Sequence, residues 1–159
     1  MNGQGYQNTR GSILDRLLDD EPDVSQEPVQ SRLFDIRRIK GTVIRDLENL
    51  LNTRRHIQPV PVQYREVNRS VFVYGLADFT SQNTKSQAVL QRLWQDIETT
   101  VSRFEPRLKN VTVHLEEGLD AGRNIRFRIN GLLVVETETE PVSLDTIFDI
   151  NRGQYVIMH

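Results

Sequence analysis

Cysteine is absent from this sequence of 159 residues. Its absence excludes a disulfide framework, a thiolate zinc site and a thiol nucleophile. Apolar runs are short as well, and none reaches the roughly 18 residues that a membrane-spanning helix needs. Residues 1–11 are rich in Gly, Asn and Gln and have no apolar stretch, so we expect no secretory signal and a cytoplasmic protein.

Lysine is scarce, because 17 of the 20 basic residues are Arg. The net charge of −2 counts against general nucleic-acid binding, which uses a basic surface. Arg is enriched where surfaces are buried against protein partners, although a GC-rich genome produces the same bias. The composition therefore leaves both explanations of the Arg content open.

Charges of one sign gather in blocks along the chain. Residues 15–27 carry a net charge of −5, residues 32–55 carry +4, and residues 136–149 contain five acidic residues and no basic one. Opposed blocks suit polar docking surfaces. They are equally compatible with pairing inside the fold or with solvation.

The domain organisation follows from length and composition. Residues 1–30 are predicted to form a flexible tail with a short amphipathic helix at residues 13–18 and an acidic linker, and residues 31–159 a single domain. The apolar residues of this helix are Ile13, Leu14, Leu17 and Leu18. So short a helix is not stable alone in water, so it must dock on its own domain or on a partner.

Two long helices are predicted from apolar residues that recur every three or four positions, at residues 31–52 and 86–104. Gly41 weakens the first helix and permits a kink or a close helix crossing. Ser86 or Thr84 can cap the second helix, and Pro106 ends it. The stretch between the helices, residues 53–81, lacks periodicity; a short strand is predicted at residues 71–74, and Gly75 can supply a positive φ.

The C-terminal third alternates apolar and polar residues, which predicts strands near residues 111–115, 125–135, 142–150 and 154–158. The fold class is therefore predicted as α+β, with the N-terminal helices packed on one face of a C-terminal antiparallel sheet of about four strands. The last strand is apolar and uncharged. At a sheet edge it would be open to pairing with another chain, whereas inside the sheet it would not.

Catalytic chemistry finds little support. The three His residues have no metal-ligand spacing, and no phosphate-binding loop or Gly-x-Ser-x-Gly turn occurs. A glycoside hydrolase needs two facing carboxylates, for which Glu105 is one candidate; Glu116, Glu117, Asp78 or Asp120 is the other. The sequence secures no such pair. We therefore predict no catalytic, cofactor-binding or metal-binding residues.

The triplet Glu105-Pro106-Arg107 follows the second helix. Proline fixes the backbone, so two opposite charges are held in a set geometry at a helix exit. Arg107 can reach a carboxylate on a partner, and Glu105 a backbone N–H or a partner arginine. Alternatively, the two charges pair within the fold.

Four motifs occur in a recognisable order at residues 12–19, 44–54, 74–79 and 104–108. Together they resemble the TssE subunits of type VI secretion baseplates, which belong to the phage-tail baseplate wedge family once labelled "lysozyme-like". The resemblance runs from about Ser12 to Met158, and Glu105-Pro106-Arg107 is its most diagnostic part. Ala77 departs from the pattern, because proline is expected in the Tyr-Gly loop.

The resemblance implies a structural subunit of a cytoplasmic baseplate docked at the inner membrane, without hydrolase activity, nucleic-acid binding or membrane insertion. The implied partners are the TssF and TssG wedge subunits, with TssK as a further candidate, and contractile sheath subunits. A sheath strand would add to a sheet edge by β-augmentation, and the subunit would in this way template sheath assembly. The partner-binding residues expected on this basis are Glu105, Pro106, Arg107, Tyr74, Gly75, Asp78, Tyr155 and Ile157. The alternatives are a peptidoglycan hydrolase and a small regulatory anti-adaptor of the same fold.

Overall fold

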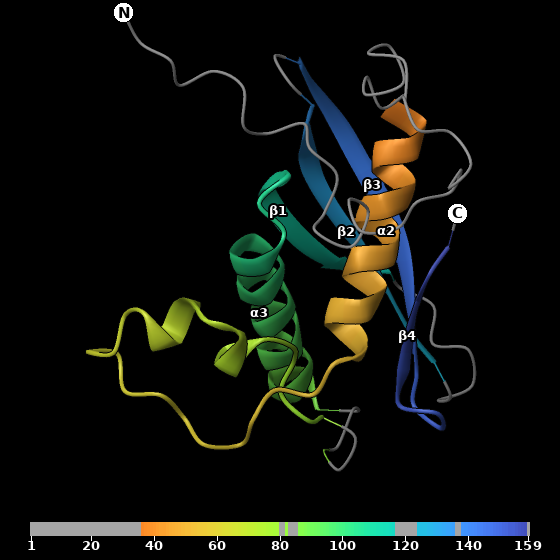
Figure 1. Cartoon of the computed structure of the whole chain (residues 1–159). Coiled ribbons are helices and arrows are strands. Elements are labelled where there is room, and N and C mark those ends of the chain that lie inside the picture. The colour runs from red at the N-terminus through yellow and green to blue at the C-terminus, as the bar shows by residue number, and fades with distance from the viewer. Residues whose placement is uncertain (1–35, 80–81, 83–85, 117–123, 136–137, 159) are drawn as a thin grey trace, which may run out of the picture.

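A computed structural model describes residues 36–79, 82, 86–116, 124–135 and 138–158. Within these residues, two α-helices precede four strands (Figure 1), which confirms the predicted α+β class. The elements are α2 (Ile36–Asn52), the 3-10 turns η2 (Val67–Arg69) and η3 (Val71–Val73), α3 (Gln87–Phe104), β1 (Leu108–Leu115), β2 (Asn124–Val135), β3 (Glu138–Asp149) and β4 (Gln154–Ile157). The amphipathic helix predicted at residues 13–18 lies outside the described residues.

The sheet is antiparallel, with its strands in the order β1-β2-β3-β4. The last strand, β4, therefore lies at an edge, which is the first of the two positions considered for it. Because β4 is short, it pairs only with Thr146–Asp149 at the end of β3. No other described strand pairs with the first half of β3 on that side.

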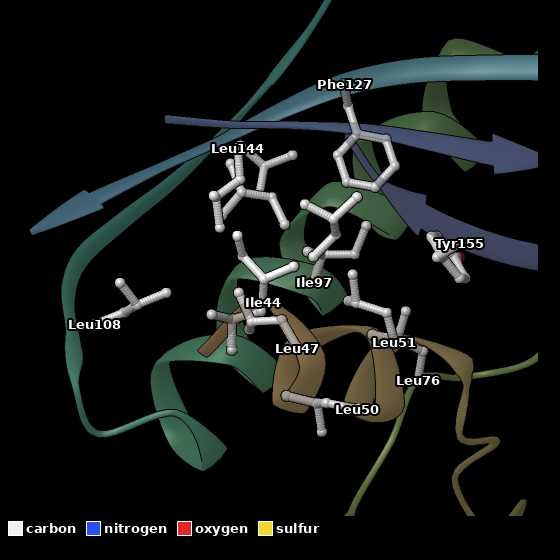
Figure 2. Packing of buried hydrophobic residues seen from close by; sticks show 14 of the residues in the cluster. Ile44, Leu47, Leu50, Leu51, Leu76, Ile97, Leu108, Phe127, Leu144 and Tyr155 are labelled. Carbon is white, nitrogen blue, oxygen red and sulfur yellow. The ribbon is translucent and has the colours of Figure 1, made fainter. Parts of the chain in front are cut away.

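The core lies between the two helices and one face of the sheet. Figure 2 shows Leu47 and Leu51 of α2 and Ile97 of α3 gathered opposite Phe127 and Tyr155 of the sheet. All five are buried, because the helices present one apolar stripe each and the strands present alternate residues. Gly41 lies in an unbroken α2, and no atom of another described segment lies within 4 Å of a Cβ built there, so Gly41 marks no close crossing of the described helices.

The prediction of a strand at Val71–Tyr74 is wrong, because Val71–Val73 form the 3-10 turn η3. The Ser70 side chain accepts a hydrogen bond from the Phe72 N–H, and the Val73 N–H donates to the Ser70 carbonyl. These local bonds satisfy the backbone in a turn where no neighbouring strand does so. The positive φ predicted for Gly75 is confirmed at 97°.

The corner between α3 and β1 follows the expectation from Pro106. Helix α3 ends at Phe104, and Glu105 occupies its C-cap position. Ser86 precedes α3, but its side chain makes no capping hydrogen bond. β1 starts at Leu108 and carries a bulge between Lys109 and Thr112, where Asn110 has a positive φ of 52°.

Candidate functional site

The Glu105-Pro106-Arg107 turn folds its two charges onto each other. Arg107 Nε donates to Glu105 Oε1, and Arg107 Nη2 to Glu105 Oε2, each at 2.6 Å. The Arg107 backbone N–H also points to Glu105 Oε1, at 3.2 Å. This bidentate pairing of the guanidinium with the carboxylate is the strongest arrangement available to an Arg–Glu pair. Of the two possibilities considered for these charges, pairing within the fold is present in the structure.

Helix α2 completes the cluster. Arg107 Nη2 donates to Asp46 Oδ2 at 2.6 Å, and Nη1 to Thr42 Oγ1 at 3.2 Å. Only 13% of the Arg107 side chain and 5% of the Glu105 side chain are exposed. Burial lowers the Arg107 pKa, but hydrogen bonds and charge from Glu105 and Asp46 outweigh it and raise the pKa above its usual value. We call these four residues, Thr42, Asp46, Glu105 and Arg107, the corner cluster.

Tyr74 reaches the corner cluster from the loop between the helices. Its ring packs edge-on against Phe104, with 5.2 Å between the ring centroids. Burial raises the Tyr74 pKa, and the charges of Asp46 and Glu105 raise it further. The structure thus brings together Tyr74, Glu105 and Arg107 of the predicted partner-binding residues.

Gly75 fixes the loop against the end of α2. A Cβ at this position would lie 2.4 Å from the Thr53 carbonyl oxygen, so glycine is required for space as well as for its positive φ. The Leu76 N–H donates to that same carbonyl at 2.9 Å, and the Arg55 N–H donates to the Leu76 carbonyl at 2.8 Å. Gly75 therefore acts within the fold and orients Tyr74.

Asp78 and Pro106 are exposed, but in different places. Asp78 lies 3.8 Å from Arg54, away from the corner cluster. Pro106 lies on the outer side of the corner. Among the predicted residues of the triplet, Pro106 is thus the one open to a partner.

Tyr155 and Ile157 point their side chains into the core, and their backbone groups face outward toward α2. The Asn52 side chain accepts from the Tyr155 N–H at 2.8 Å and donates to the Tyr155 carbonyl at 2.9 Å. Glu48 Oε1 accepts from the Ile157 N–H at 3.0 Å. Polar side chains of α2 thus occupy the backbone groups at this edge. Partner binding by Tyr155 and Ile157 stays a prediction, and it requires these bonds to open.

The other edges differ from β4. On β1, Glu98 Oε1 accepts from the outward Val113 N–H at 2.7 Å. On β3, the odd-numbered residues face the β4 side, because the Met158 N–H donates to the Asp145 carbonyl. The same alternation directs the backbone groups of Thr139, Pro141 and Ser143 to the side where β4 is missing.

The model of the family described as baseplate wedge protein gp25 matches residues 37–138, which is more than half of the chain. The chain belongs to this family. The match includes the corner cluster and the three motifs at residues 44–54, 74–79 and 104–108, and it confirms the resemblance to this family; the motif at residues 12–19 lies outside the matched residues. No curated protein matches the chain.

A wedge-family member is a structural protein, and the chemistry of the corner cluster agrees with that role. Both Glu105 oxygens are held by Arg107, so this carboxylate is not placed to protonate a sugar. Within the described ranges, no group of His, Asp or Glu residues has the arrangement of a metal site. No helix in the same ranges is long and apolar enough to cross a membrane.

The contribution of α2 to the corner cluster and to the edge at β4 was not predicted from the sequence. Asp46, Glu48 and Asn52 make polar contacts to the corner or to β4, yet none of them is among the site residues predicted from the sequence. A signal was present, because all three lie in the motif at residues 44–54 that carries the family resemblance. Glu48 and Asn52 are also four residues apart and therefore share one side of the helix.

Proposed function

We propose that this wedge-family protein is a non-enzymatic subunit of a type VI secretion baseplate, of the TssE kind, in the cytoplasm at the inner membrane. It docks on the TssF and TssG wedge subunits, with TssK as a further candidate, and adds a strand of the contractile sheath to its sheet. One observation supports the strand-addition part of this proposal: on the β4 side of β3, β4 pairs only with Thr146–Asp149, and no other described strand pairs with the first half of β3. We call β3 half-paired for this reason.

The incoming strand pairs with β3 in line with β4. Thr139 and Ser143 offer an outward N–H and C=O each, and Pro141 offers only a C=O because it has no N–H. All three side chains are exposed, whereas Val142 and Leu144 are buried and hold β3 on the core. Strand addition therefore requires no rearrangement of the core, and main-chain bonds supply the affinity.

Ser143→Pro tests this edge selectively. The substitution removes an outward N–H but leaves the ladder to β2 intact, because β2 bonds to the even-numbered residues of β3. Pro141 already occupies an equivalent position two residues away. We expect Ser143→Pro to lose co-purification with sheath subunits and to retain TssF and TssG.

Ser143→Ala is the matched control, since it removes the hydroxyl that donates to Asn130 but keeps the N–H. It should bind sheath subunits as the unmodified chain does. Equal sheath binding by all three proteins would refute strand addition at β3.

Wedge docking is proposed at the outer side of the corner. The corner cluster holds the turn rigid from inside, and Pro106 presents its outer surface to the partner. Pro106→Glu is expected to abolish co-purification with TssF and TssG while thermal unfolding shifts by less than a few degrees. Retention of both subunits by Pro106→Glu would refute docking at this site.

Zymography of the purified chain should show no lysis of peptidoglycan.

A further inference from the structure

The loop between the helices carries an unusual share of exposed apolar surface. We call residues 56–73 the arm; Figure 1 shows it projecting from the end of the molecule where α2 ends and α3 begins. Nine large hydrophobic side chains are exposed in the described part of the chain, and six of them lie in the arm: Ile57, Val62, Tyr64, Val67, Val71 and Phe72. Ile57, Val62 and Val71 are 94%, 89% and 86% exposed. Such a concentration marks an interaction surface.

The base of the arm is fixed to the body. The hydrogen bonds of Leu76 to Thr53 and of Arg55 to Leu76 hold its two ends together. Asp96 of α3 accepts from Arg55 Nη2 at 2.8 Å and from the Ala77 N–H at 2.9 Å. The His56 and Phe72 rings also lie 5.1 Å apart across the arm. The base of the arm, and with it the exposed apolar side chains, is therefore held in a fixed position relative to α2 and α3.

The free charges of the arm are mainly positive. Arg65 and Arg69 are exposed, against one acidic residue, Glu66. Arg54 and Arg55 at the base are engaged by Asp78 and Asp96. A surface of exposed aliphatic and aromatic groups with arginines beside them fits an amphipathic segment whose polar side is acidic.

One stretch of this chain has that chemistry. Residues 13–27 combine four apolar residues at helical spacing with six acidic residues and a single Arg. We propose that residues 13–27 bind the arm of the same molecule, with Ile13, Leu14, Leu17 and Leu18 on its apolar side chains and the acidic residues beside Arg65 and Arg69. This inference does not depend on the proposed baseplate function.

The chain is long enough for this contact. The arm lies at the end of α2, and α2 is roughly 25 Å long at 1.5 Å per residue. The eight residues 28–35 between the segment and α2 reach roughly 28 Å when extended, and the seventeen residues 19–35 between Leu18 and α2 reach roughly 55 Å. Intramolecular binding is favoured over exchange between molecules, because the tether raises the effective concentration of the segment to the millimolar range.

The absence of native cysteine makes a disulfide-trapping test clean. In the full chain, the pair Leu17→Cys and Val71→Cys reports contact between segment and arm. The matched control pairs Leu17→Cys with Thr112→Cys, because Thr112 is also exposed but lies on β1. We expect the first pair to form an intramolecular disulfide about tenfold faster than the control under mild oxidation.

Each outcome decides the matter. A fast intramolecular disulfide that slows to the control rate when Ile57→Asp and Val62→Asp are added supports the proposal. Equal rates for the two pairs overturn it, and so do disulfide-linked dimers, which would assign the segment to a second copy. Circular dichroism of each variant verifies that these surface substitutions leave the fold intact.

Discussion

At the scale of single residues, Arg107 stabilises the corner between α3 and β1 through bonds inside the fold. Its guanidinium binds Glu105 and Asp46 at 2.6 Å and joins a helix end to another helix. Replacing one member of such a pair leaves the other buried and uncompensated, which costs more than the pair itself contributes. The triplet therefore holds the shape of the corner at which wedge docking is proposed.

Arg107→Gln is expected to lower the free energy of unfolding by about 3 kcal/mol, because Glu105 then remains buried without its partner. Urea denaturation followed by circular dichroism measures this change. Arg65→Gln, on the exposed arm, is the control and should change stability by less than about 0.5 kcal/mol. Equal stabilities for the two variants would show that the corner cluster does not support the fold.

Substituting Ala for each of two glycines should change the free energy of unfolding in opposite directions. Gly75→Ala should destabilise by about 2 kcal/mol or more, because a Cβ would lie 2.4 Å from the Thr53 carbonyl at a φ of 97°. Gly41→Ala should stabilise by about 0.5–1 kcal/mol, because it adds helix propensity at a position where no atom of another described segment lies within 4 Å of the new Cβ. Thermal unfolding of both variants checks the signs, and a stable Gly75→Ala would contradict the role given to Gly75.

Tyr155 is expected to make the free energy of unfolding depend on pH in the alkaline range. Burial raises its pKa above the usual value of 10, with smaller contributions from nearby charges. Since the folded state keeps this proton and the unfolded state loses it near pH 10, the free energy of unfolding should fall as pH rises above about 10. Denaturation at pH 9 and pH 11 should show this fall, with a smaller fall for Tyr155→Phe. An identical fall in the variant would assign the effect to other groups.

At the scale of elements, α2 does more than fill the core. Its polar residues Glu48 and Asn52 bond the outer backbone groups of β4, so a helix takes the place of a fifth strand there. Covering an edge in this way protects a short apolar strand from unwanted pairing. Among the described residues, the stretch of this side of the sheet without a strand partner or a helix partner is thereby confined to the first half of β3.

Asn52→Leu should cost about 1 kcal/mol of stability and expose the Tyr155 backbone groups. Hydrogen exchange at the Tyr155 amide is expected to become faster, while exchange at Val113, which Glu98 protects, stays unchanged. Asn49→Leu, also exposed on α2, is the control. Unchanged exchange at Tyr155 in Asn52→Leu would mean that Asn52 does not protect the edge.

The elements themselves could be predicted well from local patterns. Apolar spacing and Pro106 placed α3 within one residue of its bounds, and alternation found all four strands. The strand predicted at Val71–Tyr74 failed because Ser70 supplies local hydrogen bonds that favour a turn. The contacts of Asp46 and Asn52 could not be predicted, since they join residues 61 and 103 positions apart and depend on how α2 is oriented on the sheet.

At the scale of the whole molecule, three surfaces are separated in space. The corner cluster joins α2 to the turn between α3 and β1, the half-paired strand lies on the β4 side of β3, and the arm projects beyond the end of α2 (Figure 1). A wedge subunit with several neighbours requires such separation, because simultaneous partners must not compete for one surface.

Residue-resolved hydrogen exchange on the complex with a sheath subunit tests strand addition most directly. The amides of Thr139 and Ser143 should become protected on binding, and those of Tyr155 and Ile157 should stay as they are in the free chain, because α2 already bonds them. Protection gained at Tyr155 and Ile157, or none at Thr139 and Ser143, would contradict strand addition at β3.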